Sequence, residues 1–460
     1  MNAHNVVHAV NPATEEINGT YELHSPQHVE QALAASAAYR DWRRTPFSLR
    51  ADLMRRAASI LRDRKSKLAT IITSEMGKPI AEAEAEVEKC AWCCDHYAEN
   101  AERYLSDEPR VSNASRSYIQ FTPLGTILAV MPWNFPFWQV FRFAAPALMA
   151  GNTGILKHAS NVPGCSLAIE EIFREAGFPE GVFRSVLVPG SLAAFLIRDP
   201  RIAAVTLTGS EQAGSEVAAL AGRELKKTVL ELGGSDPFIV LGDADVDLAA
   251  ATAVRARYQN AGQSCIAAKR FILLEKVADA FEERFVEAAR SLKTGDPMDR
   301  STQIGPLARA DLREALDLQV RESVRQGARL LLGGRSRPGR GYYYEPTVLA
   351  DVHPAMPVFC EEVFGPVAAF IRAKDPEDAV RIANDSAYGL GASVWTRDLD
   401  LAQRLAREIE SGSVFVNGMV VSDPRLPFGG IKRSGYGREL SEFGIREFVN
   451  IQTVWVGPAR

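Results

Sequence analysis

The alternation of short aliphatic runs with longer amphipathic stretches constrains the fold of this chain more than any other feature. Five runs rich in β-branched and aliphatic residues lie between residues 125 and 234, each bounded by Gly, Ser or Pro, and amphipathic stretches separate them. Strands that alternate with helices predict a parallel sheet with helices on both faces, and therefore an α/β fold. The five runs are residues 125–133, 154–160, 182–190, 203–210 and 226–234.

A second block of the same kind predicts a second parallel sheet. Amphipathic runs again lie between its short apolar runs, which indicates another set of helices. The expected strands of this block are residues 237–241, 270–276, 366–373, 391–398 and 413–417.

The segments outside these two blocks differ from them in pattern. Residues 28–101 place apolar side chains at three- and four-residue spacing, which is typical of helices. Residues 116–121 alternate like a strand but stand apart from the helices on either side, and the tail is glycine-rich from residue 428 and then strand-like. We therefore expect three structural units: residues 1–110 with 125–232, residues 233–427, and residues 111–124 with 428–460.

The charge balance argues against nucleic acid or a membrane as a partner. Lys and Arg total 53 against 57 Asp and Glu, a formal net charge of −4, and the pI is about 6.1. No basic surface is indicated, and no segment approaches the roughly 20 apolar residues of a spanning helix. The first residues lack the features of a secretion signal, and the six cysteines are irregularly spaced. We expect free thiols and a cytoplasmic location.

Ligands of parallel α/β sheets bind at the carboxyl ends of the strands, so the residues after each run are candidate site residues. Asn134 follows the first run, where an amide can donate to an oxyanion or simply form a turn. Glu231 lies near the end of the fifth run, shortly before its two glycines, where a carboxylate is either paired structurally or acts as a base. Cys265 has small neighbours and is either an approachable nucleophile or an inert buried thiol. Taken singly, each residue leaves both alternatives open.

Seven motifs taken together resemble those of the aldehyde dehydrogenase superfamily. They are PWNFP, KHAS, LTGS, ELGGSDP, GQSC, EEVFGP and PFGGIKRSGYGRE, and the resemblance runs from about residue 11 to the C-terminus. The GQ-x-C motif with ELGG upstream is highly specific, and the chain looks most like the short succinate-semialdehyde dehydrogenases. The resemblance implies two Rossmann-like parallel-sheet domains, an NAD(P)-binding one over residues 1–110 and 125–232 and a catalytic one over 233–427. It also implies a small β flap that forms a homodimer or homotetramer.

The resemblance implies catalytic roles for three residues. Cys265 matches the nucleophile whose thiolate adds to the aldehyde to give a thiohemiacetal. Asn134 matches a donor to the resulting oxyanion, together with the backbone N–H of Cys265. Glu231 matches the base that activates water to hydrolyse the thioester left after hydride transfer. The implied reaction is oxidation of a small aldehyde to a carboxylic acid rather than transfer of the acyl group to coenzyme A.

The cofactor motif departs from the common Gly-x-Gly-x-x-Gly pattern. Gly209, Ser210 and Gly214 lie at a strand-to-helix turn, where N–H groups and the helix dipole can bind a phosphate, although an ordinary tight turn also fits. Lys157 matches the family lysine at the adenine ribose. Ser160 stands where many members carry an acidic residue that repels a 2′-phosphate, so we expect NADP to be accepted alongside NAD. The other positions that match cofactor-binding residues are Trp133, Leu232, Glu362, Phe364 and His158, which replaces the usual Pro.

The substrate residues implied by the resemblance are Arg142, Ser422 and Arg425. Arg142 matches an arginine that binds the distal carboxylate in succinate-semialdehyde enzymes, with an exposed arginine on a helix face as the alternative. Ser422 and Arg425 fall on a loop that lines the aldehyde tunnel in the family, and a guanidinium is well suited to carboxylates. The second arginine of those enzymes is Gln259 here. Either Arg425 replaces it, or the enzyme accepts a broader set of semialdehydes and aliphatic aldehydes.

Two other functional classes use some of the same residues. A thioester hydrolase without a redox cofactor needs Cys265 and Glu231 but has no use for Lys157 or Glu362. A catalytically silent binding protein has no need of an intact Cys265, Glu231 and Asn134. The sequence therefore favours the dehydrogenase.

Two further clusters carry no function in this interpretation. Cys90, Cys93, Cys94 and His96 are metal-binding residue types, but they lie in a helical run without a second pair of ligands, so no metal site is expected. The acidic stretch of residues 82–89 is interpreted as a solvated helix face.

Overall fold

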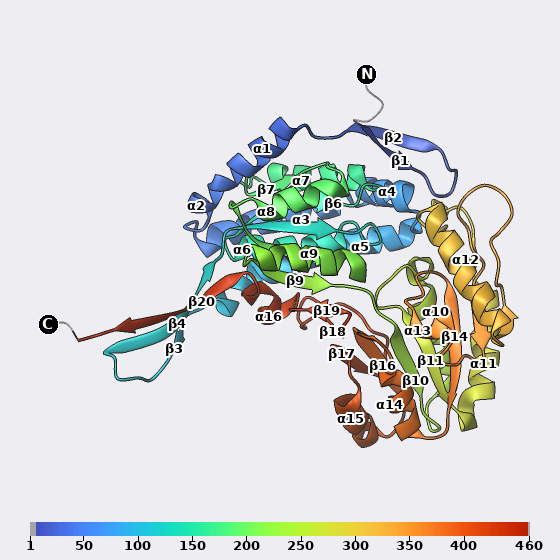
Figure 1. Cartoon of the computed structure of the whole chain (residues 1–460). Helices are drawn as coiled ribbons and strands as arrows, with labels where there is room; N and C mark the ends of the chain where they lie inside the picture. The colour runs from blue at the N-terminus through green and yellow to red at the C-terminus, as the bar shows by residue number, and fades with distance from the viewer. Residues whose placement is uncertain (1–5, 459–460) are drawn as a thin grey trace.

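The computed structural model describes residues 6–458 and consists of two α/β units with a small projecting sheet. Figure 1 shows the first unit mainly in blue to green, the second from yellow-green to red-orange, and the projecting sheet as the cyan strands β3 and β4 beside the red strand β20. The expected fold class of two parallel-sheet units with a small antiparallel sheet is confirmed.

The first unit is built on a six-stranded sheet with the order β19-β9-β8-β5-β6-β7. All neighbouring pairs are parallel except β19–β9, which is antiparallel. Ile127, Leu128 and Ala129 of β5 are fully buried, because helices cover both faces of the sheet. The strands are β5 (Thr126–Met131), β6 (Thr153–His158), β7 (Phe183–Ser185), β8 (Ile202–Thr208), β9 (Lys227–Glu231) and β19 (Gly435–Tyr436).

Helices of the first unit begin and end at recognisable signals. The Ser25 hydroxyl accepts the backbone N–H of His28 at the start of α1, and Gly77, with φ of +83°, ends α4. Every residue of α6 is buried, Arg142 included. The helices are α1 (Pro26–Ala35), η1 (Ser36–Ala38), α2 (Tyr39–Trp42), α3 (Phe47–Asp63), α4 (Lys65–Met76), α5 (Ile80–Tyr104), α6 (Trp138–Met149), α7 (Pro163–Glu175), η2 (Gly190–Leu192), α8 (Ala193–Arg198) and α9 (Glu211–Arg223).

The second unit is built on a seven-stranded sheet with the order β12-β13-β14-β11-β10-β16-β17, in which only β12 is antiparallel to its neighbour. Its core includes the packed rings of Phe271, Phe281, Phe285 and Phe370. The strands are β10 (Asp236–Val240), β11 (Ala268–Leu274), β12 (Arg329–Leu332), β13 (Thr347–Ala350), β14 (Val367–Ala373), β16 (Gly391–Trp395) and β17 (Ser413–Val416). The helices are α10 (Val246–Tyr258), η3 (Gln259–Gly262), α11 (Glu275–Arg290), α12 (Ala310–Arg325), α13 (Pro357–Cys360), α14 (Pro376–Asn384) and α15 (Leu399–Glu408).

The projecting sheet joins distant parts of the chain. β20 (Val449–Val456) pairs antiparallel with β4 (Arg116–Pro123) along its whole length, and β3 (Glu108–Pro109) pairs with the other edge of β4. The strand expected at residues 116–121 and the strand-like tail are therefore partners within one chain. Ile451 and Trp455 of β20 are more than half exposed.

Residues 428–448, which we expected to belong to the third unit, lie elsewhere. β18 (Ile431–Lys432) pairs with β15 (Tyr388–Gly389), β19 extends the first sheet beside Glu231, and α16 (Ser441–Arg446) contacts α5. Gly435 has a φ of +110°, and a Cβ there would lie 2.0 Å from the carbonyl oxygen of Leu230. The glycine-rich segment thus folds back against β9, and the functional division into domains stays a prediction. A hairpin of β1 (Val6–Val10) and β2 (Ile17–Glu22), together with β12 and β13, had not been predicted from the sequence.

The buried carboxylate of Glu86 in α5 links Lys78, just before α5, to the start of α6. Lys78 and Glu86 form an ion pair, and their side chains are almost fully inaccessible. The second carboxylate oxygen of Glu86 accepts the backbone N–H groups of Phe137 and Trp138 at 2.9 and 3.0 Å. These bonds satisfy donors at the beginning of α6, the helix that carries Gln139 to the site described below.

We predict that Glu86→Gln lowers the stability by about 3–5 kcal/mol, because it removes the carboxylate that is bonded to the buried Lys78 ammonium. The measurement is the thermal denaturation midpoint, compared with that of the double variant Lys78→Met/Glu86→Gln. The double variant keeps an oxygen for the two N–H groups and removes the buried cation, so it should recover much of the loss. An unchanged midpoint for Glu86→Gln would contradict this account of the pair.

Candidate active site

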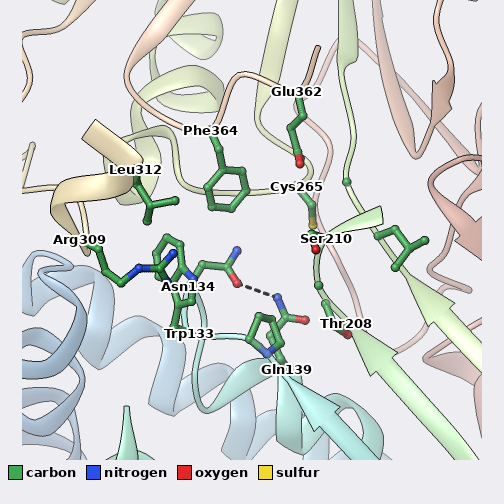
Figure 2. Close-up of a pocket in the computed structure, with 14 residues that line it drawn as sticks. Trp133, Asn134, Gln139, Thr208, Ser210, Cys265, Arg309, Leu312, Glu362 and Phe364 are labelled. Atoms are coloured by element: carbon green, nitrogen blue, oxygen red, sulfur yellow. Dashed lines mark hydrogen bonds between the residues drawn. The ribbon is translucent and has the colours of Figure 1, made fainter. Parts of the chain in front are cut away.

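A cavity of about 370 Å³ lies where the carboxyl ends of the first sheet face the second unit. Figure 2 shows side chains from both units on its walls. The loop after β5, the turn from β8 to α9 and the segment after β9 contribute one side, and the second unit contributes the other. The lining residues are Pro132, Trp133, Asn134, Gln139, Thr208, Gly209, Ser210, Leu232, Gly233, Cys265, Arg309, Leu312, Glu362 and Phe364.

The loop that carries Cys265 is held by buried cations. Asn260 and Ala261 adopt the left-handed conformation (φ of 55° and 51°), which is uncommon for residues other than glycine. The Arg257 guanidinium donates to the carbonyl oxygens of Gly262 at 2.8 Å and Gly365 at 2.6 Å. Lys269 Nζ donates to the carbonyl oxygen of Cys265 at 2.7 Å. The backbone at the thiol is therefore anchored from within the second unit.

The Cys265 thiol is accessible from the cavity. The residue is half-buried and lines both this cavity and a second, smaller one on its other side. Burial raises the pKa of the thiol to about 12, although Arg142 and Lys269 act in the opposite direction. The thiol is thus protonated at neutral pH in the free protein, and a nucleophilic role needs activation of this group. Because Cys265 lines two cavities, it does not fit the alternative of an inert, fully buried cysteine.

The Asn134 amide is oriented by its neighbours. Its Oδ1 accepts a hydrogen bond from Gln139 Nε2 at 3.2 Å, drawn as the dashed line in Figure 2, and its Nδ2 donates to the carbonyl oxygen of Gln263 at 3.1 Å. Asn260 Nδ2 donates to the backbone carbonyl of Asn134 at 2.8 Å. These bonds fix the side chain on the wall beside Cys265, with its Nδ2 as the donor group.

Glu231 is the last residue of β9, and its carboxyl group is buried. The residue is 2 % exposed, and neither carboxylate oxygen has a hydrogen-bond partner among residues 6–458. Burial raises the pKa of Glu231 well above its usual value; Glu439 adds to this, and Arg142 opposes it. Glu231 is close enough to influence the pKa of Cys265 but does not line either cavity. A buried carboxyl group without a partner is costly, which does not fit a purely structural ion pair and makes Glu231 a candidate base.

The turn from β8 to α9 has the features of a phosphate-binding turn. Ser210 caps α9 by accepting the N–H of Ala213, and Gly209 borders open space, since a Cβ there would contact only Leu207 at 3.6 Å. A Cβ at Gly214 would lie 2.5 Å from Leu232, so the glycine lets α9 pack closely on the end of β9. Free N–H groups in the first turn of α9 can therefore face an anion in the cavity.

The opposite wall presents a carboxylate and aromatic rings. Glu362 accepts the N–H of Gly234 at 2.9 Å, with Lys269 Nζ at 3.8 Å, and burial raises its pKa. The ring of Phe364 packs edge-on against Trp133, with centroids 5.8 Å apart. This combination of a flat aromatic wall, a carboxylate and a helix start fits a nicotinamide dinucleotide: rings for the base, Glu362 for a ribose hydroxyl and α9 for a phosphate.

Lys157, His158 and Ser160 lie at the end of β6. Ser160 is exposed and lines a cavity of about 240 Å³ together with His158 and residues 187–190, and no acidic residue lines that cavity. Lys157 forms no ion pair within the part of the chain that the structure describes, and burial lowers its pKa. The His158 ring differs from expectation, because Nε2 lies 2.8 Å from the carbonyl oxygen of Pro136 and Nδ1 accepts the N–H of Ala159. Both ring nitrogens are therefore used within the protein, and burial lowers the pKa of His158 to about 4.

The second cavity, of about 140 Å³, lies on the other side of Cys265 between α5, α6 and the loop of residues 420–422. Arg142 and Ser422 line it, and Gln259 forms part of its wall. Arg142 is 2 % exposed, so the alternative of an exposed helix arginine does not hold. Arg425 lines neither cavity: its side chain is 67 % exposed, because Asp423 binds its guanidinium at the surface.

Comparison with known proteins identifies the family. A model described as the aldehyde dehydrogenase family matches residues 1–454. The chain belongs to this family. It is accordingly an NAD(P)-dependent oxidoreductase that acts on aldehydes.

Similar aldehyde dehydrogenases match over nearly the whole chain. A probable succinate-semialdehyde dehydrogenase (NADP+) of Synechocystis sp. is 54 % identical, over 97 % of this chain and 99 % of that protein. The succinate semialdehyde dehydrogenase (NAD(P)+) Sad of Escherichia coli K12 is 53 % identical, over 97 % of each chain. The crystal structure of succinic semialdehyde dehydrogenase from Streptococcus pyogenes in complex with NADP+ superposes with a TM-score of 0.96, at 38 % identity, over 98 % of this chain and all of that chain.

Sequence reasoning missed several residues of this aldehyde dehydrogenase site. The stretch 82–89 is not simply a solvated helix face: Glu82, Glu86 and Lys89 lie on one side of α5 and line the second cavity. These residues are four and then three positions apart, and this helical spacing could have indicated that they share one face of α5. Gln139, which orients Asn134, and Trp138 were also missed; both lie within three residues after the PWNFP motif.

Two other features of the chain are plain from the structure. No helix within residues 6–458 is long and apolar enough to cross a membrane. Cys90, Cys93 and Cys94 are buried in α5, and residues 6–458 contain no group of three or more His, Cys, Asp or Glu side chains arranged to hold a metal ion.

We predict that alkylation of Cys265 in the free enzyme accelerates with pH without reaching a plateau. Because the pKa of this thiol is about 12, the thiolate fraction rises about tenfold per unit between roughly pH 7 and 10. The rate of iodoacetamide labelling is measured in a Cys360→Ser background, which removes the exposed thiol. The same background with Cys265→Ser reports any labelling of the four buried cysteines. A plateau below about pH 9 would show that the thiol is already activated in the free enzyme.

Proposed function

We propose that this aldehyde dehydrogenase oxidises succinate semialdehyde to succinate, with NADP+ as a cofactor and NAD+ accepted as well. The substrate is supported by the relatives, which are named for it at more than half identity over almost their entire length. The observation that carries the proposed reaction is the convergence of Cys265, Asn134 and Glu231. They come from three distant segments: Cys265 and Asn134 line one cavity at the end of the first sheet, and Glu231 lies close enough to Cys265 to raise the pKa of its thiol.

In this proposal the reaction begins at Cys265 with formation of a carbon–sulfur bond. The thiol gives its proton to water in the cavity, the resulting thiolate adds to the aldehyde carbon, and the carbonyl oxygen becomes an oxyanion that accepts hydrogen bonds from Asn134 Nδ2 and the Cys265 N–H. The Gln139 bond keeps the Asn134 amide in the orientation that presents Nδ2. When bound, the nicotinamide cofactor supplies the acceptor for the hydride of the former aldehyde carbon. A thioester on Cys265 remains.

Glu231 releases the acid in the second half of the proposed reaction. Its carboxylate takes a proton from water, the water oxygen bonds to the thioester carbon, and the carbon–sulfur bond breaks; the leaving sulfur takes up the proton held by Glu231, which gives the carboxylic acid and the thiol and restores the carboxylate. Burial raises the pKa of Glu231, which makes its carboxylate a stronger base than an exposed one. A cofactor-independent thioester hydrolase uses the same two residues but gives no role to Gly209, Ser210 and Phe364, which line the larger cavity.

The cofactor is held in the proposal by both units. Gly209, Ser210 and the start of α9 receive the phosphates, with Gly214 allowing α9 to pack closely beside them. The nicotinamide end is held by Trp133, Leu232, Glu362 and Phe364. Lys157 and Ser160 face the adenosine end, and the lack of acidic side chains around Ser160 favours acceptance of a 2′-phosphate.

The projecting sheet supports a further proposal on assembly. Ile451 and Trp455 are exposed on β20, and an apolar, exposed strand of this kind is suited to burial against another copy of the chain. We infer a homodimer or homotetramer formed through this sheet. Free thiols and the cofactor support a cytoplasmic location.

We predict that Glu231→Gln gives a burst of reduced cofactor, about one per active site, followed by turnover at least about 100-fold slower than wild type. The amide keeps the size of the side chain but cannot accept the proton of water, so the enzyme stops as the acyl-enzyme. Stopped-flow absorbance at 340 nm measures both phases. Steady turnover at the wild-type rate would remove Glu231 from the role of base.

We predict that Ser160→Glu lowers kcat/KM for NADP+ by about tenfold or more while changing that for NAD+ little, because the new carboxylate repels the 2′-phosphate. Ser160→Gln is the matched control, since it has the same size without the charge. Equal losses for both cofactors in both variants would mean that the residue does not face the 2′ position.

A further inference from the structure

We propose that Lys89, positioned by Ser422 and Trp138, binds the distal carboxylate of the substrate, and that Arg142 serves as a structural partner of Glu439. This inference rests on the proposed function, because it concerns the end of the aldehyde farthest from Cys265. It differs from the arrangement of arginines that the family resemblance implies.

Lys89 is a cation without a counter-ion on the wall of the second cavity. It extends from α5, and its Nζ lies 2.7 Å from Ser422 Oγ and 4.3 Å from the centre of the Trp138 ring. It forms no salt bridge within the described part of the chain. Its surroundings lower its pKa to about 8, mainly by burial and secondly through Arg142. A carboxylate bound in this cavity would supply the missing negative charge.

Ser422 is arranged as a second donor for the same ligand. Its oxygen lies within hydrogen-bonding distance of two groups that can only donate, Lys89 Nζ at 2.7 Å and Trp138 Nε1 at 3.0 Å. Because both lone pairs of the hydroxyl oxygen are engaged, its own proton must point elsewhere. Ser422 lines the cavity, so the lysine ammonium and the serine O–H present two donors to an anion.

Arg142 is committed to the protein. Its guanidinium is paired with the buried Glu439, donates to Gln139 Oε1 at 2.9 Å, and lies over the Phe428 ring at 4.6 Å. The pair with Glu439 offsets part of its charge close to the cavity. With Arg425 at the surface and Gln259 neutral, Lys89 is the one cation of the cavity wall, among residues 6–458, that lacks an acidic partner.

The acidic side chains in the same wall are already engaged. Glu86 is paired with Lys78 and accepts two backbone N–H groups. Glu82 accepts the N–H of Asn260 at 2.7 Å, and burial raises its pKa to about 7, which reduces its charge. Neither competes for the Lys89 ammonium, because no bond joins them to it.

The test compares succinate semialdehyde with butanal, which has the same four carbons but no carboxylate. We expect Lys89→Met to lower the ratio of kcat/KM for succinate semialdehyde to that for butanal by roughly 10- to 100-fold, mainly through KM. Lys89→Arg should retain much of the ratio, and Ser422→Ala should reduce it by a smaller factor. Lys67→Met, which removes an exposed lysine on α4, is the matched control and should leave the ratio unchanged.

Binding of the product gives a second measurement that does not depend on turnover of the semialdehyde. Succinate should inhibit butanal oxidation by the wild type, and Lys89→Met should weaken this inhibition by a similar factor. If Lys89→Met fails to fold, Ser422→Ala carries the same test.

The outcomes separate the two proposals. If the wild type shows no preference for succinate semialdehyde over butanal, the proposed substrate is wrong. If the wild type has the preference and Lys89→Met keeps it, with unchanged inhibition by succinate, the substrate stands and the role of Lys89 is overturned. Equal losses for both aldehydes in Lys89→Met would likewise show that the lysine supports the cavity and does not bind the carboxylate.

Discussion

Two buried cations, Arg257 and Lys269, determine where the reactive sulfur lies. Their donors are used on carbonyl oxygens around the Cys265 loop, including those of Gly262, Gly365 and Cys265 itself. The loop contains left-handed residues that would relax if these bonds were absent. Because the cations belong to the second unit and the facing groups to the first, the site exists only where the two units meet. The cavity depends on this placement, and so does the Asn134 amide, which donates to the carbonyl oxygen of Gln263 in the same loop.

Charge is distributed unequally around that sulfur. Arg142 and Glu439 form a buried pair beside Glu231, and this pair offsets part of the field that each exerts on the base. Farther along the second cavity, Lys89 remains without a counter-ion. A substrate with an aldehyde at one end and a carboxylate at the other matches this polarity: a neutral carbonyl near the thiol and an anion near the ammonium. Electrostatics thereby links the proposed chemistry to the proposed substrate.

Much of the fold and the reacting groups could be predicted from the sequence because both follow local rules. Asn134, Gly209 and Glu231 lie at or just after the ends of predicted strands, and the carboxyl ends of parallel strands gather at one edge of a sheet. Among the strands missed by this reasoning, β1, β2 and β12 are short and partly exposed, and β13 is buried but only four residues long. The return of residues 435–436 to the first sheet depends on a tertiary contact of Gly435 that no periodicity encodes.

The residues that line the second cavity were harder to predict from the sequence, for a physical reason. In residues 82–89 acidic side chains alternate with apolar ones, and only the packing of α5 against α6 determines that Glu86 and Lys89 face inward. Arg425 has the residue type suited to a carboxylate, yet Asp423 two positions earlier binds it at the surface. A motif can therefore identify a reacting residue, while the sign of the charge in a cavity depends on which ions are already paired.

The measurement that tests the central claim most directly is the mass of the enzyme after a single turnover. Wild-type protein with NADP+ and succinate semialdehyde is quenched in acid within milliseconds and digested, and its cysteine peptides are analysed by mass spectrometry. The account predicts a succinyl thioester on the peptide that contains Cys265 and on no other, formed together with reduced cofactor. Reduced cofactor without any acyl group on Cys265, or an acyl group carried by Cys360, would contradict it.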